Sequence, residues 1–122
     1  MKDTRAIKGK QGENAVAQYL RNQGYTIRAH NFTKQYGEVD LIAHKNDTLV
    51  FVEVKTRTNP LVDPAEVISI HKQKRITKAA KAYIAHSAHT DDFVYRFDVA
   101  LVEEHNNDFH IRYIENAFYA FE

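Results

Sequence analysis

Residues 37–57 constrain the fold of this chain most, because two strand-like runs follow each other there across a short turn. The runs at 39–44 and 49–56 are rich in valine, leucine and other apolar residues that favour strands. The polar residues 45–47, Lys-Asn-Asp, lie between them and suit an antiparallel hairpin. The middle of the chain is therefore predicted to form two adjacent antiparallel strands.

Two helices are expected beside these strands. The first is predicted over residues 10–23, where apolar residues recur at helical spacing and Gly24 suits a left-handed helix cap. The second has two competing start signals, a capping box that begins at Asp63 and a later serine, Ser69. We favour the later start, after which one face of the helix is apolar and another is rich in lysine.

Further strands are predicted at 25–29, before a turn at Asn31, and at 93–102 and 109–114. The resulting order is α-β-β-β-α-β-β. It predicts an α/β fold with a mixed central sheet of about five strands flanked by helices. A length of 122 residues allows one core of moderate size, so residues 1–122 are expected to form a single domain.

Composition limits the classes of site and partner. The chain has no cysteine, which excludes disulfides and thiolate metal sites and leaves oxygen or histidine ligands for any metal. No apolar run approaches the roughly 20 residues of a membrane span, and the N-terminal residues lack the apolar centre of a secretory signal. We therefore expect a cytoplasmic protein without a membrane partner.

Charge is unevenly distributed along the chain. Residues 1–81 carry a net charge of +7, whereas residues 82–122 carry a net charge of −6. Clustered lysine and arginine gain affinity for phosphates through counterion release, so the basic part suggests a polyanionic partner. The alternative is two solvated faces of opposite sign.

Carboxylates on the two central strands form the first candidate site. Side chains alternate between the faces of a strand, so Glu38 shares a face with Asp40, and Glu53 shares one with Lys55. Each strand is thus expected to have an apolar side and a side that bears charge. Asp40 and Glu53 are equally far from the hairpin turn, so they can be cross-strand neighbours if both side chains face the same way. Such a pair suits Mg²⁺, which needs few protein carboxylates beside phosphate oxygens. The alternative is a cross-strand salt bridge on an exposed face.

Glu13 is a further candidate, because it projects from the helix stripe that is expected to face the sheet. A carboxylate that points inward needs a metal, a lysine or hydrogen bonds beside it. The alternative is an N-terminal glutamate that is favoured by the helix dipole. Gly9 and Gly12 precede it, and they either permit close backbone approach or loosen the start of the helix.

Asp98 alternates with Phe97 and Val99 in a predicted strand. We expect a structural role for it, either in a pair near Arg96 or as the anchor of a turn.

Several motifs follow one another in an order that resembles a single protein family. They are GxxGENAVAQYLxxxGY at 9–25, GEVDLIA at 37–43, LVFVEVKTR at 49–57, RFDV at 96–99 and ENAF at 115–118. These motifs resemble those of the bacterial YraN family, which is similar to archaeal Holliday junction resolvases. The resemblance covers nearly the whole chain and implies the restriction-endonuclease-like, or PD-(D/E)xK, nuclease fold.

The resemblance also implies an active site. Asp40 matches the metal-binding aspartate, and Glu53 matches the second ligand of Mg²⁺ or Mn²⁺. Glu13 matches the glutamate of the first helix, and Lys55 matches the active-site lysine. Val39 stands where the superfamily motif has proline, a difference that many members tolerate. The implied activity is metal-dependent hydrolysis of phosphodiester bonds in DNA, with branched or junction DNA as one substrate class. The alternative is a nucleic-acid-binding or scaffolding protein with a vestigial nuclease site.

A set of basic and polar residues is expected to contact the DNA backbone, so that recognition depends on DNA structure rather than on sequence. The set is Lys8, Lys10, Arg57, Lys72, Gln73, Lys74 and Arg75. Gln73 belongs to it through the resemblance, since some relatives place a polar helix residue near the site. The alternative for each basic residue is a solvated helix face. Cleavage of a junction implies a symmetric homodimer, for which the strand at 109–114 is a candidate interface.

Overall fold

The computed structural model describes residues 4–57, 68–87, 92–106 and 108–121, with their side chains except at 4–8 and 105. Its elements are α1 (Thr4–Asn22), β1 (Thr26–Lys34), β2 (Gly37–Lys45), β3 (Thr48–Arg57), α3 (Ile70–His86), β4 (Val94–His105) and β5 (Asp108–Phe118). This is the order α-β-β-β-α-β-β that the sequence predicts. No helix in these ranges combines the length and the apolar character that crossing a membrane requires.

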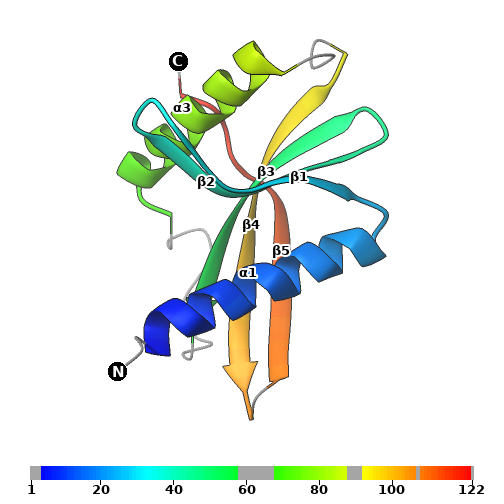
Figure 1. Cartoon of the computed structure of the whole chain (residues 1–122), viewed down its shortest axis with the longest axis vertical. Helices are drawn as coiled ribbons and strands as arrows, with labels where there is room; N and C mark the ends of the chain where they lie inside the picture. Colours follow the sequence, from blue (N-terminus) through cyan, green and yellow to red (C-terminus); the bar gives the residue numbers. More distant parts are fainter. Residues whose placement is uncertain (1–3, 58–67, 88–91, 107, 122) are drawn as a thin grey trace.

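The described strands form a five-stranded sheet in the order β1-β2-β3-β4-β5 (Figure 1). Neighbouring strands are antiparallel except for β3 and β4, which run parallel and have α3 between them in the chain. The sheet is therefore mixed, as predicted. Together with the two helices it has the arrangement of the restriction-endonuclease-like fold. β1 and β5 are the edge strands.

The two helices cover opposite faces of the sheet (Figure 1). α1 contributes Leu20 to the core cluster that contains Val50, whereas α3 contributes Ile76 to the cluster that contains Phe51. The residues from 49 to 52 are all 0% exposed. The centre of β3 is therefore buried on both faces. The face of β3 that was expected to bear charge is charged only from Glu53 onward. Before Glu53, α3 packs on this face and buries it.

Local signals set the ends of the helices. Gly24 has a φ of +96°, and its backbone nitrogen donates to the carbonyl of Arg21 at 3.0 Å, which closes α1 in the predicted left-handed cap. Ser69 Oγ accepts a hydrogen bond from the backbone nitrogen of Lys72 at 3.1 Å, so α3 begins at the later of the two predicted signals. Asp63, which opens the other signal, lies outside the described residues.

Several element boundaries differ from the predictions. The turn predicted at Asn31 is wrong, because β1 continues to Lys34 and pairs with β2 as far as Gly37. Asn31 instead has a φ of +48° within the strand. The residues after it are mostly polar and exposed, as edge strands tolerate, so they give no periodic signal. α1 begins at Thr4, before the first apolar residues that repeat at helical spacing.

The buried carboxylate of Asp98 pairs with Arg96 on β4 and joins this strand to β5. Asp98 is 0% exposed, and its carboxylate accepts hydrogen bonds from Arg96 Nη2 at 2.9 Å, from the Tyr113 hydroxyl at 2.6 Å and from the backbone nitrogen of Asn116 at 3.1 Å. Arg96 Nη2 also donates to the hydroxyl of Tyr25 at 2.8 Å. This network confirms that Asp98 pairs with Arg96 in a structural role.

Candidate functional site

β2 and β3 separate at the candidate site. Their antiparallel ladder ends at the pair of Leu41 and Val52, and Figure 1 shows β2 turning away from β3 on the side of its first residues. Asp40 precedes this pair, and its Oδ2 atom accepts a hydrogen bond from the backbone nitrogen of Val54 at 2.8 Å. The predicted register is confirmed. Asp40 and Glu53 are nevertheless not ladder partners, because the Asp40 side chain bonds to the β3 backbone where the ladder stops.

Glu53 is the buried acidic group of the site. It is 2% exposed, and its burial, together with hydrogen bonding to Asp40 and the negative charge of Asp40, raises the pKa of Glu53 to about 9. Its Oε2 atom has no hydrogen-bond partner among the described residues. At neutral pH Glu53 therefore retains a proton beside Asp40. A cation that displaced this proton would face two carboxylates.

Two lysines bring positive charge to these carboxyl groups. Lys72, in the first turn of α3, places its Nζ atom 2.5 Å from Glu38 Oε1 and 3.4 Å from Glu53 Oε2. Burial acts to lower the pKa of Lys72, but its hydrogen bond to Glu38 and the neighbouring carboxylates raise that pKa overall. The charge of Lys55, on β3, acts to lower the pKa values of Glu53 and Glu38. The acidic groups thus lie among cations that also suit a phosphate.

Glu38 also belongs to the site, although it is not among the candidate residues predicted from the sequence. Its hydrogen bond from Lys72 is the main cause that lowers the pKa of Glu38. Arg75 Nη1 lies 3.3 Å from the same Oε1 atom. Alternation along β2 is the signal that points to Glu38, since it shares a strand face with Asp40. Glu38 holds two cations of α3 beside the site.

Glu13 approaches Asp40 from the other helix. Partial burial and the negative charge of Asp40 raise the pKa of Glu13, while the charge of the exposed Lys10 acts to lower it. Gly12 permits this approach, because a Cβ atom at residue 12 would collide with Oγ1 of Thr56 in β3. α1 therefore lies close to β3 at Gly12. Gly12 is one of the two glycines, with Gly9, at which the sequence suggests a close backbone approach.

The acidic groups fit a hard divalent cation that is held through few protein ligands. Among the described residues, no group of three or more histidine, aspartate or glutamate side chains is arranged to hold a metal ion. Mg²⁺ keeps several waters and needs only one or two protein carboxylates when a phosphate supplies further oxygens. Asp40 and Glu53 offer two carboxylates, and the Oε2 atom of Glu53 has no hydrogen bond among the described residues. This donor set suits Mg²⁺ or Mn²⁺ in a site that the substrate completes.

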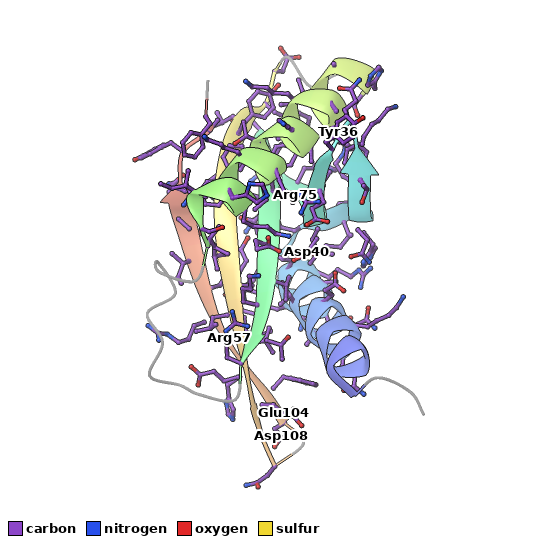
Figure 2. The ribbon with its side chains drawn as sticks, turned by 90° about the vertical axis from the view of Figure 1, so that its left-hand side faces the viewer. Tyr36, Asp40, Arg57, Arg75, Glu104 and Asp108 are labelled. Carbon is purple, nitrogen blue, oxygen red and sulfur yellow. The ribbon has the colours of Figure 1, made fainter. Side chains whose placement is uncertain are left out.

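Two arginines flank the carboxylates. In Figure 2, Arg75 and Arg57 lie on opposite sides of Asp40. Arg75 extends from α3 to Glu38, and Arg57 ends β3, where its Nη1 atom donates to the carbonyl of Thr56 at 3.2 Å. A phosphate backbone that crosses Asp40 would meet positive charge in both directions.

Three other residues are predicted to contact DNA, namely Lys8, Gln73 and Lys74. No contact in the described part of the chain brings them to the carboxylates. Lys74 is exposed, with its Nζ atom 5.7 Å from the centre of the Phe121 ring. The side chain of Gln73 donates from Nε2 to the carbonyl of Ile68 at 3.0 Å, where it supports the start of α3. The side chain of Lys8 lies outside the described residues. A role in DNA binding stays a prediction for all three.

Known proteins resemble this chain over most of its length. The pattern of the uncharacterised protein family UPF0102 matches residues 12–102, which include the four residues predicted to be catalytic. A UPF0102 protein of Bacteroides thetaiotaomicron is 44% identical over 112 residues, which cover 91% of each chain. One of Clostridium botulinum (strain 657) is 40% identical over 113 residues, 90% of this chain and 92% of the relative. One of Synechococcus sp. (strain JA-3-3Ab) is 44% identical over 97 residues, 78% of this chain and 73% of the relative. The chain therefore belongs to the uncharacterised protein family UPF0102, which is the YraN family that its motifs resemble.

Proposed function

We propose that this protein is a divalent-metal-dependent endonuclease that hydrolyses phosphodiester bonds in DNA. The observation that carries the proposal is the proximity of Asp40, Glu53 and Glu13, from three different elements, where β2 leaves β3. Acidic groups so close together repel a phosphate unless a cation neutralises them. A protein that only binds nucleic acid gains nothing from this cluster, so a metal-dependent reaction at a phosphate accounts for it best.

Asp40 and Glu53 are the residues that would hold Mg²⁺ or Mn²⁺. The backbone of Val54 fixes the Asp40 carboxylate through its hydrogen bond to Oδ2, so a rigid strand orients this ligand. Glu53 gives up the proton that its raised pKa retains. When bound, the metal lowers the pKa of a water molecule and neutralises charge on the phosphate.

The other groups of the site act around the phosphate. Lys55 stabilises the negative charge that develops on the phosphate oxygens, or orients the attacking water. Glu13, whose pKa is raised by burial and by Asp40, accepts a proton from that water. Lys72 and Arg75 offer positive charge to a neighbouring phosphate.

DNA is proposed as the substrate because positive charge extends beyond the site. Arg57 and Arg75 flank Asp40 (Figure 2), and residues 1–81 carry a net charge of +7. Binding of this kind weakens as salt concentration rises. For cleavage of opposed strands we propose a two-fold symmetric homodimer through the edge strand β5.

The test is cleavage of labelled duplex, single-stranded and four-way-junction DNA in Mg²⁺, in Mn²⁺ and in EDTA. The site variants Asp40→Asn, Glu53→Gln and Lys55→Met are compared with Asp47→Asn and Lys78→Met, which remove the same kinds of charge from exposed positions. We expect metal-dependent cleavage by the wild type and by both exposed controls. Each site variant should lose at least about 100-fold in rate while a thermal melt shows that it remains folded at the assay temperature.

Two other outcomes would identify the alternatives. Equal DNA affinity in EDTA and in Mg²⁺, without cleavage and without loss in Asp40→Asn, would indicate a nucleic-acid-binding protein with a vestigial site. Absence of both DNA binding and metal binding would indicate a scaffolding protein, for which the acidic residues 82–122 are the candidate contact region. Either result would overturn the endonuclease proposal.

A further inference from the structure

The turn between β1 and β2 exposes an aromatic ring that does not contribute to the core. Tyr36 is 89% exposed, more than any other large apolar side chain in the described residues. Gln35 and Tyr36 have φ values of +53° and +66°, and the pair of Lys34 and Gly37 closes the two-residue turn. Such turns favour asparagine and glycine, which adopt positive φ with the least strain. A tyrosine at this position strains the backbone and exposes an apolar ring to water, so it does not stabilise the fold. We infer that the ring contacts another molecule.

The turn is held firmly on α3. Gly37 follows Tyr36 and is buried, because a Cβ atom at residue 37 would collide with the backbone nitrogen of Ala79 and lie 2.7 Å from the carbonyl oxygen of Arg75. β2 therefore rests directly on the backbone of α3, and the Tyr36 ring is presented from a fixed position. A ring on a rigid support loses little conformational entropy when a flat partner stacks on it.

The ring lies in line with the candidate active site. In Figure 2, Tyr36, Arg75 and Asp40 follow one another from the upper part of the view to its centre, and Arg75 forms its ion pair with Glu38, which lies between Tyr36 and Asp40 in the chain. Tyr36 lies directly before β2, and the three residue steps from Gly37 to Asp40 span about 10 Å along an extended strand. That distance corresponds to about three stacked bases.

We propose that Tyr36 stacks on an unpaired nucleobase of the DNA substrate, with Arg75 near the adjacent phosphate. The inference rests on the proposed nuclease function and narrows its substrate to DNA with unpaired bases, such as single strands and flaps. Bases inside a duplex are covered by their neighbours and offer no face to the ring. Lys34 and Gln35 beside the ring are exposed and polar, which suits a nucleic acid better than the apolar centre of a protein interface.

The test compares binding to a single strand that contains 2-aminopurine, to a flap and to a blunt duplex. Binding is measured in EDTA, and in Mg²⁺ on the Glu53→Gln background so that cleavage does not consume the probe. Tyr36→Ala should lose about 5- to 150-fold in affinity for the single strand and the flap, with little change for the duplex. It should also lose the fluorescence quenching that stacking causes. Tyr36→Phe keeps a ring, and Tyr119→Ala removes a ring that is 82% exposed elsewhere, so both should bind like the parent.

A glycine variant separates binding from folding. Tyr36→Gly relieves the strain of a positive φ, so we expect a higher melting temperature together with the same loss of single-strand affinity. Unchanged single-strand affinity in Tyr36→Ala, or an equal loss for duplex DNA, would overturn the inference. A change in oligomeric mass without a change in DNA affinity would also overturn it and would identify a contact between copies of the chain.

The failure of this inference and that of the nuclease proposal are distinguishable. Base stacking that depends on Tyr36, in a wild type that never cleaves DNA, would support the stacking role and overturn the nuclease. Metal-dependent cleavage with Tyr36→Ala equal to the wild type on every substrate would support the nuclease and overturn the stacking role.

Discussion

The Oδ2 atom of Asp40 accepts a hydrogen bond from the backbone nitrogen of Val54 at 2.8 Å, at the point where the ladder between β2 and β3 ends. One side chain therefore supports the divergence of the strands and also belongs to the candidate metal site. An alanine variant would lose both functions at once. Asp40→Asn keeps an oxygen acceptor and removes the charge, so it separates them.

We expect Asp40→Asn to fold like the wild type. Asp40→Ala should lose about 1–3 kcal/mol of unfolding free energy, because the N–H of Val54 loses its acceptor. Both variants should lose Mn²⁺ binding, since neither supplies a carboxylate to the cation. Denaturant unfolding measures the stability, and calorimetric titration measures the metal affinity. A wild-type Mn²⁺ affinity in Asp40→Asn would show that the cation binds elsewhere.

Divalent-cation binding is expected to release protons. Burial, with hydrogen bonding to Asp40 and its charge, raises the pKa of Glu53, so the metal-free protein holds a proton that the cation must displace. Between the ordinary value of 4.5 and the raised value of about 9, cation affinity should therefore increase with pH. Titrations at about pH 7 in two buffers of different protonation enthalpy should show about one proton released per ion. No proton release there would contradict the raised pKa.

The same carboxyl group makes the metal-free fold less stable as pH rises. Between the two pKa values the folded protein binds more protons than the unfolded chain, so the unfolding free energy falls from about pH 4.5 and levels off above about pH 9. Glu53→Gln lacks this dependence. It should exceed the wild type by at least about 1.4 kcal/mol, the equivalent of one pKa unit, at alkaline pH, with little difference in acid. Asp108→Asn, an exposed control, should follow the wild type, and parallel curves for Glu53→Gln and wild type would exclude the effect.

Lys72 is expected to oppose cation binding and to favour phosphate binding. Its Nζ atom lies 3.4 Å from Glu53 Oε2, so it repels a metal ion at the same carboxylate. Lys72→Met should raise Mn²⁺ affinity about 5-fold, because it removes about 1 kcal/mol of repulsion between the ammonium group and the cation. The same variant should lower DNA affinity, because it removes a positive charge beside the phosphate. Lys78→Met, at an exposed position of the same helix, should leave Mn²⁺ affinity unchanged. Weaker Mn²⁺ binding in Lys72→Met would instead mean that Lys72 holds Glu53 in its binding position.

Local chemistry explains the parts of the fold and the site that the sequence predicts. The turn at 45–47 sets the register of the hairpin, and counting back from it places Leu41 opposite Val52 and Asp40 close to Glu53. Ser69 caps α3 through a contact within a single turn of helix. In each case the groups that decide the outcome are near one another in the chain.

Packing between distant elements decides the parts that the sequence does not predict. Alternation gives the strand face of Glu38 and Asp40, but the point where β2 leaves β3 depends on two helices that cover opposite faces of the sheet. In the sequence Lys72 is one of several lysines of a basic helix. Its contact with Glu53 arises because α3 docks on β2 at Gly37, a tertiary contact that no local pattern encodes.

Gly37→Ala tests how closely β2 rests on α3. The added methyl group would overlap the backbone nitrogen of Ala79, and a backbone atom cannot rotate away as a flexible side chain does. We expect a loss of about 1–3 kcal/mol of unfolding free energy from overpacking, and weaker DNA binding because α3 carries Lys72 and Arg75. Gly9→Ala is the matched control, since no described atom lies within 4 Å of its Cβ position. Within α1 that change should stabilise the protein by about 0.5–1 kcal/mol. Equal stability of Gly37→Ala and wild type would mean that β2 and α3 lie farther apart, and that α3 does not hold the turn at residues 35–36 in place.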